Sequence, residues 1–416
     1  MKCKVHDCFR TSSTATRVVY ALLFLMTSIV AWVMESDWVV NQLDKVAQGY
    51  LKQNCPENTC YGTLAVYRIM FTLSMFHLIL SACTYGATTS RGVQGGIQNG
   101  YWGPKFIFLV FGCVGCFFIP NGFFEFWGKY IAIVGAVLFM LFQMFLLVDF
   151  AHSLTEMLLA QWEDSDNQIW GFLLAVLTFG GLALALIMTI LGFVYFGTPE
   201  CHLNQVFLSV NLVAAFVLCL ISISEAVREF NPSSGLAQAS VVVVYATYLV
   251  CSAMSSEPTP APGSGTTSCN PLSSSDAAQT TTVVLGALLT FAVVSYSTTS
   301  SAMKGTVFGG ADEGYVGLET NVEDGGDDDD DRYPTDDEKQ GSVYSYSFYH
   351  FVFAIAAMYV AMLVTNWNTV TSNSGLTTVG RSWASVWVRA ATSWVVLGLY
   401  VWTLVAPVLL PDREFY

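Results

Sequence analysis

Ten apolar blocks, each long enough to cross a lipid bilayer, dominate this sequence. A bilayer core about 30 Å thick requires about 20 mostly apolar residues per helix. By that measure the candidate spans are 18–34, 64–85, 101–119, 127–150, 169–196, 205–225, 236–255, 281–303, 346–367 and 384–410. Turn-forming residues such as Asn99-Gly100 and Pro120-Asn121-Gly122 separate them. The pattern predicts a polytopic membrane protein.

Composition and charge exclude several other classes. The chain is 54% hydrophobic and 12% charged, whereas soluble domains carry about 25% charged residues. The strands of an outer-membrane barrel alternate in polarity over about ten residues, and these blocks do not. Because backbone groups in lipid must be satisfied within their own segment, we expect an all-α transmembrane fold.

Most of the net charge of −14 comes from one segment. Residues 311–340 hold thirteen acidic and two basic side chains, which leaves −3 for the rest of the chain. No basic surface remains to neutralise phosphates, so nucleic-acid binding is not expected. The run Asp327–Asp331 repels itself and predicts disorder. We interpret the segment either as a docking loop for a trafficking factor, with weak Ca²⁺ affinity, or as a solvated spacer.

The fourth span is unusually long. From about 124 to 161 there is no proline, and the only glycines are Gly128 and Gly135. A continuous helix of that length measures about 55 Å, nearly twice the membrane core. We therefore expect it to cross the bilayer as a steep diagonal.

Basic residues in the short loops predict the orientation. With the N-terminus in the cytosol, nine Lys and Arg residues face that side and six face the other. Basic residues before the first span also resemble a signal peptide, but we favour an uncleaved signal anchor. The predicted organisation is a cytosolic segment 1–17, helices one to seven over 18–256, a flexible non-cytosolic loop 257–280, helix eight over 281–303, an acidic cytosolic loop 304–345, helices nine and ten over 346–410, and a cytosolic tail 411–416.

Eight short motifs, in order along the chain, carry a family resemblance. They are VYRI (66–69), NGYW (99–102), FIP (118–120), LVDFAHS (147–153), SGL (234–236), SAMSSEP (252–258), YSYS (344–347) and YVWTLVAP (400–407). With them the chain resembles the serine incorporator family, also called the TMS/TDE family of eukaryotic membrane proteins. The resemblance implies ten helices in two bundles, joined by one long diagonal helix. It also implies a link to phosphatidylserine and sphingolipid synthesis, lipid binding, and ATP-independent phospholipid scrambling.

The main candidate site lies on the long fourth span. Asp149, His152, Ser153 and Glu156 share one helix face, because they are spaced by three, four and seven residues. Ionisable groups within a span are costly and usually face an interior or a water-filled groove. We interpret them as a polar stripe for lipid head groups. The alternatives are a hydrogen-bonded tie between the bundles or a position at the cytosolic boundary. A metal site at Asp149 and His152 is a third, weaker alternative, and we expect neither a metal nor a cofactor.

Four further residues are candidates for head-group contact. Arg68 is expected near the outer end of the second span, where it either snorkels to the boundary or binds a phosphate. His77 follows on the same helix. Glu225 and Arg228 end the sixth span, as a local ion pair or as a head-group gate.

Six cysteines lie outside the spans. Cys55, Cys60, Cys201 and Cys269 are predicted in non-cytosolic loops, where disulfides form. We expect at least one bond and favour Cys55–Cys60 for its short loop, although the sequence does not choose among the pairings. Cys3 and Cys8 lie beside a span on the cytosolic side and are candidates for palmitoylation.

These features favour a lipid-handling function over an enzyme. No P-loop, G-x-S-x-G or H-E-x-x-H motif occurs in the sequence. We expect phosphatidylserine and other phospholipids as ligands, with sphingolipids or sterol as further candidates. We also expect residence in the endomembrane system or plasma membrane, and a homo-oligomer. A scaffold or carrier that delivers serine to lipid-synthesis enzymes, or a small-molecule transporter, is the alternative.

Overall fold

The computed structural model describes residues 13–36, 38–39, 61–87, 89–90, 92–165, 167–230, 234–258, 268–272, 286, 288, 290–292, 296, 344–365, 367–371, 375–378 and 383–409. In this part of the chain, eight helices are long and apolar enough to cross a membrane, and a ninth apolar helix is shorter. The all-α transmembrane class is therefore confirmed. Most of the predicted span 281–303 lies outside the described residues, as do the loop 311–340 and Cys3, Cys8, Cys55 and Cys60.

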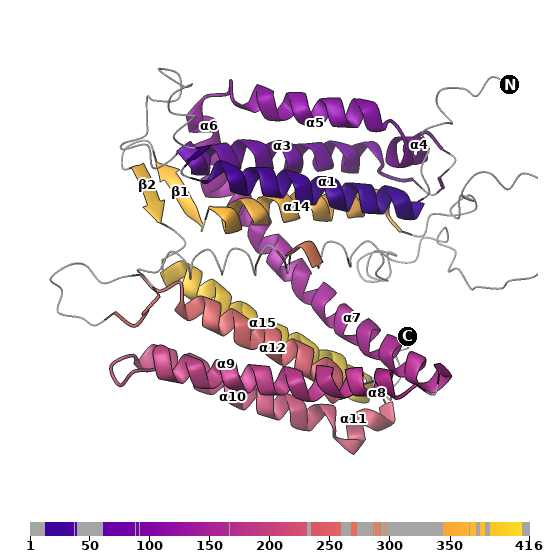
Figure 1. Cartoon of the computed structure of the whole chain (residues 1–416), viewed down its shortest axis with the longest axis vertical. Helices are drawn as coiled ribbons and strands as arrows, with labels where there is room; N and C mark the ends of the chain where they lie inside the picture. Colours follow the sequence, from indigo (N-terminus) through magenta and orange to yellow (C-terminus); the bar gives the residue numbers. More distant parts are fainter. Residues whose placement is uncertain are drawn as a thin grey trace, which may run out of the picture. The chain divides into compact units, whose positions relative to one another are not determined.

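The chain divides into two units, and the first comprises Met1–Phe139 and Leu285–Thr377. Its elements are α1 (Ser13–Met34), α3 (Tyr61–Cys83), α4 (Val93–Asn99), α5 (Trp102–Cys116), α6 (Asn121–Phe126), the π-helical segment η3 (Trp127–Ala132), the beginning of α7 (Ile133–Ser165), α14 (Tyr346–Val364), β1 (Asn368–Thr371) and β2 (Gly375–Thr378). The two strands pair with each other (Figure 1).

Helices α3 and α14 form the centre of the first unit. They pack along each other, and both bury residues on nearly every side. A helix that is apolar all round is expected where neighbours cover every face. Close packing also explains one glycine: a Cβ atom on Gly128 of η3 would overlap the ring of Tyr67 on α3.

The long fourth span is continuous, as the sequence predicts. Helix α6, segment η3 and helix α7 follow one another without a break over Asn121–Ser165, 45 residues in all. Pro120 precedes the first turn, where a missing N–H costs nothing. The division between the two units falls inside α7, after Phe139, so one helix belongs to both.

The second unit comprises Met140–Val284 and Thr378–Tyr416. Besides most of α7 it contains α8 (Gln168–Ala175), the π-helical segment η4 (Val176–Gly180), α9 (Gly181–Tyr195), α10 (His202–Ser222), α11 (Glu225–Phe230), α12 (Leu236–Met254) and α15 (Trp383–Leu409). Helix α12 packs against α9, α10 and α15. Its Ser240 hydroxyl donates to the carbonyl of Leu177 in η4 at 3.0 Å, which ties the unbroken span Gln168–Tyr195 to this centre.

Several predicted span ends differ from the structure by a few residues, and two of them involve a change of element or a polar contact. The sixth span was expected to reach residue 225, but α10 ends at Ser222 and Glu225 begins the separate helix α11. The third was expected to reach residue 119, but α5 ends at Cys116. Hydropathy follows the apolar run, whereas a helix ends where its carbonyls find other donors, and Arg68 supplies such donors to α5.

Candidate functional site

The polar stripe on α7 holds two half-buried and two exposed side chains. Asp149 and His152 are half-buried, whereas Ser153 and Glu156 are exposed. The carboxylates of Glu156 and Asp149 both act electrostatically on His152, and the His152 ring lies 6.0 Å from the ring of Tyr400 on α15. The structure therefore places all four residues on one face of a mostly apolar helix.

The four side chains include both hydrogen-bond donors and hydrogen-bond acceptors. The carboxylates accept, the Ser153 hydroxyl donates and accepts, and the imidazole does either. Seven residues of helix separate Asp149 from Glu156, or about 10 Å. The stripe therefore extends over about two turns of α7. Within the described residues, no three His, Cys, Asp or Glu side chains gather in a way that could hold a metal ion.

Arg68 does not take either of its predicted roles. Its side chain is 1% exposed, and its guanidinium donates to the carbonyls of Cys116 at 3.1 Å and Ile119 at 3.1 Å, as well as to the Asn121 side chain. It also lies 4.6 Å from the ring centre of Phe124. These carbonyls come from the C-terminal end of α5, where a cation is favourable. Arg68 therefore closes α5 and is not available to snorkel or to bind a phosphate.

His77 belongs to a buried group that we call the histidine cluster: Tyr20, His77, Gln98, Lys105 and His350. His77 and His350 are each 0% exposed, and their Nδ1 atoms lie 2.9 Å apart. The His350 Nε2 atom lies 2.7 Å from the Gln98 side-chain oxygen. The cluster joins α1, α3, α4, α5 and α14, so it holds together most of the first unit.

Lys105 completes the cluster. It is one of the nine basic residues that the orientation prediction places on the cytosolic side, but its side chain is 7% exposed. Its ammonium donates to the Gln98 carbonyl at 3.0 Å and lies 4.4 Å from the ring centre of Trp102. Aromatic faces stabilise a desolvated cation in this way. Of the cluster, sequence reasoning singled out only His77; the available signal was that Lys105 and His350 also lie within predicted spans.

The hydrogen-bond partners determine how the two histidines are protonated. The Gln98 amide nitrogen donates to the Tyr344 hydroxyl at 3.1 Å, so its oxygen faces His350 and accepts from Nε2–H. A neutral His350 then has a bare Nδ1, which accepts from His77 Nδ1–H. The remaining His77 Nε2 atom is buried and has no hydrogen-bond partner among the residues that the structure describes.

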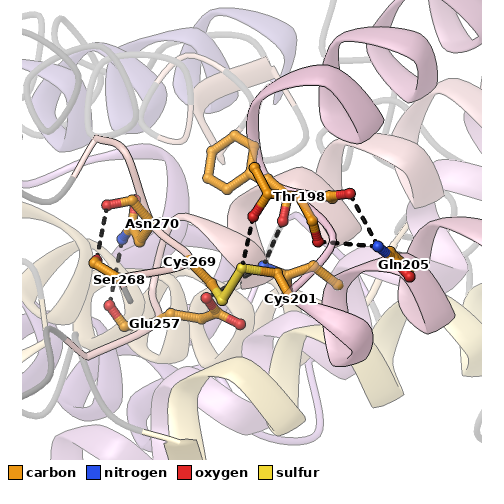
Figure 2. The surroundings of a disulfide bond; sticks show 10 residues. Thr198, Cys201, Gln205, Glu257, Ser268, Cys269 and Asn270 are labelled. Carbon is orange, nitrogen blue, oxygen red and sulfur yellow. Dashed lines mark hydrogen bonds between the residues drawn. A yellow bond between two sulfur atoms is a disulfide. The ribbon is translucent and has the colours of Figure 1, made fainter. Parts of the chain in front are cut away.

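A second polar group lies beside the disulfide of the second unit (Figure 2). Cys201 and Cys269, two of the four candidate cysteines, are bonded, with Cα atoms 5.7 Å apart. Glu257 is 4% exposed, and its carboxylate accepts from Asn204 at 3.2 Å. Burial raises the pKa of Glu257, and the hydrogen bond from Asn204 opposes that shift. The disulfide and the hydrogen bond between Asn204 and Glu257 both connect the beginning of α10 to the segment that follows α12.

The remaining candidates differ in their surroundings. Glu225 and Arg228 are exposed on α11, and their role as a head-group gate stays a prediction. Arg389 of α15 donates to the Ser252 carbonyl at 3.0 Å and to the Ser252 hydroxyl at 2.6 Å on α12. This cation therefore links two helices of the second unit.

Comparison with known proteins identifies the family of this chain. A family model described as serine incorporator (Serinc) matches residues 1–413. A probable serine incorporator of Monosiga brevicollis is 37% identical over 97% of this chain and 92% of its own length. Membrane protein TMS1 of Saccharomyces cerevisiae is 33% identical over 98% and 92%, respectively, and serine incorporator 3 of Bos taurus is 32% identical over 97% and 93%. The chain therefore belongs to the serine incorporator family of membrane proteins.

Proposed function

We propose that this protein binds phospholipids and moves them between the two leaflets without ATP. The observation that carries the proposal is the stripe Asp149, His152, Ser153 and Glu156, which presents exposed polar atoms on a continuous 45-residue apolar helix. A head group crossing a bilayer must keep polar contacts, because an uncompensated charge in hydrocarbon costs several kcal/mol. Contacts with the stripe lower that cost while the acyl chains stay in lipid.

The charge of the stripe favours particular lipids. Its two carboxylates attract the ammonium group of serine and ethanolamine lipids and the quaternary amine of choline lipids. Phosphatidylserine is therefore the first ligand to test, and other phospholipids and sphingolipids follow. We further propose residence in the endomembrane system or plasma membrane, a trafficking factor for the loop 311–340, and a homo-oligomeric state.

Scrambling in liposomes tests the proposal directly. Purified protein is reconstituted into vesicles that carry a fluorescent phospholipid in both leaflets, and an impermeant quencher is added outside. We expect nearly complete loss of fluorescence without ATP, because inner-leaflet lipid reaches the quencher. Loss of about half the signal, as in protein-free vesicles, contradicts scrambling.

The names of the relatives favour a second candidate, a carrier that delivers serine to lipid-synthesis enzymes. The sequence contains none of the hydrolase or metalloprotease motifs named above, so we assign no catalytic residue to the chain. Uptake of labelled serine into the same vesicles separates this carrier, or a small-molecule transporter, from a scramblase. Conversion of labelled serine into lipid by the purified protein alone would instead indicate an enzyme.

A further inference from the structure

A cavity in the second unit contains a hydrogen-bond acceptor that no residue in the described part of the chain satisfies. The cavity measures about 260 Å³ and lies between α9, α10 and α12. Its walls are mostly apolar, and they include Leu182, Ala185, Ala215 and Val243. Asn211 of α10 lines it, is 1% exposed, and has a side-chain oxygen without a hydrogen-bond partner.

The orientation of the Asn211 amide follows from its neighbour. The Thr247 hydroxyl donates to the Val243 carbonyl at 2.8 Å, so toward Asn211 it acts as an acceptor. The Asn211 nitrogen donates to it at 3.0 Å, which leaves the Asn211 oxygen free. A buried acceptor without a donor costs free energy, so a donor from outside the chain is favoured at this position.

The other polar residues of the cavity do not provide that donor. The Thr189 hydroxyl donates to the Ala185 carbonyl at 2.8 Å. Cys219 is eight residues from Asn211 on the same helix, or about 12 Å along the axis. Since no donor remains among the described residues that line the cavity, we assign the donor to a molecule that enters it.

The depth of Asn211 restricts the chemistry of that molecule. Asn211 is the tenth residue of the span His202–Ser222, about 14 Å from its beginning at 1.5 Å per residue. A charged head group is costly so far from both surfaces, and an acyl chain has no donor to offer. Leu186, Leu212 and Phe216 at the rim are 52%, 41% and 64% exposed, which leaves the cavity open to a molecule that arrives from the lipid.

We propose that this cavity binds a sterol, whose hydroxyl group donates to the Asn211 side-chain oxygen. A sterol has a single polar group, which matches the single free acceptor. Diacylglycerol would bring two ester carbonyls, and ceramide an amide and a second hydroxyl, without partners for them in these walls. The site is distinct from the α7 stripe and does not depend on lipid scrambling.

Photolabelling of the full-length protein in phosphatidylcholine nanodiscs tests this site. The probe is a cholesterol analogue with a photoreactive diazirine, and peptides are mapped by mass spectrometry. We expect labels on α9, α10 and α12 that cholesterol displaces. The 3-O-methyl ether of cholesterol keeps the shape but lacks the donor, so it should displace the probe at least tenfold more weakly. Equal displacement by the two competitors overturns the hydrogen bond to Asn211.

Variants of the cavity residues test the position of the site independently of the competition between cholesterol and its methyl ether. Ala215→Phe fills the cavity and should abolish labelling, whereas Val213→Phe places the same ring on a side chain that is 62% exposed and should leave it unchanged. Asn211→Leu should weaken labelling about tenfold. Labelling that survives Ala215→Phe contradicts the site, and stronger competition by diacylglycerol or ceramide contradicts the sterol as its occupant. The wild-type competition series decides the question even if a variant fails to fold.

Discussion

His77 on α3 and His350 on α14 face each other through their Nδ1 atoms at 2.9 Å, although 273 residues separate them in the sequence. One ring must donate and the other accept, so each histidine satisfies a buried atom of its partner. This pair lies between the two helices that form the centre of the first unit. Removing one of the two rings should therefore cost more stability than removing a buried histidine that has no such partner, because the other ring loses its hydrogen bond.

We predict that His350→Phe lowers the free energy of unfolding by about 2–3 kcal/mol. It leaves buried polar atoms of His77 and Gln98 without partners. The double variant His77→Phe/His350→Phe should cost less than the sum of the single variants, by about 1 kcal/mol. Thermal unfolding in detergent measures both effects. His202→Phe, at an exposed position, is the control, and strictly additive effects would contradict a direct bond.

Glu35, just after α1, should make stability depend on pH. Burial raises its pKa from 4.5 to about 7, and a hydrogen bond from Thr63 opposes that shift. Between pH 4.5 and about pH 7, this carboxyl group is therefore protonated in the folded protein but ionised in the unfolded chain. Stability should fall as pH rises from about 4.5 to about 7 and then stay level.

We predict that Glu35→Gln removes this pH dependence. At pH 8 it should be more stable than the wild type by about 1–3 kcal/mol, and at pH 4 nearly equal. Thermal unfolding at both pH values provides the comparison. Glu163→Gln, at an exposed position on α7, should show no such difference; a Glu35→Gln effect that is the same at pH 4 and pH 8 would be inconsistent with a buried carboxyl group.

The disulfide should stabilise the second unit. Cys201 and Cys269 are 68 residues apart, and a crosslink over a long segment restricts the unfolded chain. We predict that Cys201→Ser lowers the free energy of unfolding by about 2–4 kcal/mol. Reductant should lower the melting temperature of the wild type more than that of the variant, which lacks the Cys201–Cys269 bond. Cys83→Ser, which removes an exposed free cysteine, is the matched control, and equal melting temperatures for all three proteins would refute the prediction.

Features that depend on local sequence were predictable. The absence of proline through 124–161 indicated one continuous helix, and the structure has one over Asn121–Ser165. The same reasoning could not recognise the π-helical segment η3, because Trp127–Ala132 differs from an α-helix only in its hydrogen bonds. Spacing also placed the four stripe residues on one face, but whether that face was covered depended on distant helices.

Features that depend on distant partners were not predictable. Arg68 looked like a boundary residue, because nothing near it in the sequence indicates that the carbonyls of Cys116 and Ile119 will surround it. The preference for Cys55–Cys60 rested on the short loop between them, and it stays a prediction because both cysteines lie outside the described residues. The bond between Cys201 and Cys269 joins segments 68 residues apart, and loop length carries no information about such a contact.

The last prediction concerns the stripe on α7. If head groups contact its carboxylates, the double variant Asp149→Asn/Glu156→Gln removes two charges while it keeps the size of both side chains, and the scrambling rate of phosphatidylserine in liposomes should fall about three- to tenfold. Asp164→Asn removes a charge from an exposed position in the last turn of α7 and should leave the rate unchanged. The melting temperature of each variant shows whether the protein is intact.

A folded double variant that scrambles at the wild-type rate would show that lipids do not follow these carboxylates. A loss limited to serine, ethanolamine and choline lipids, with phosphatidylglycerol unaffected, would show that the carboxylates act on the amine, because phosphatidylglycerol has a phosphate but no cationic group.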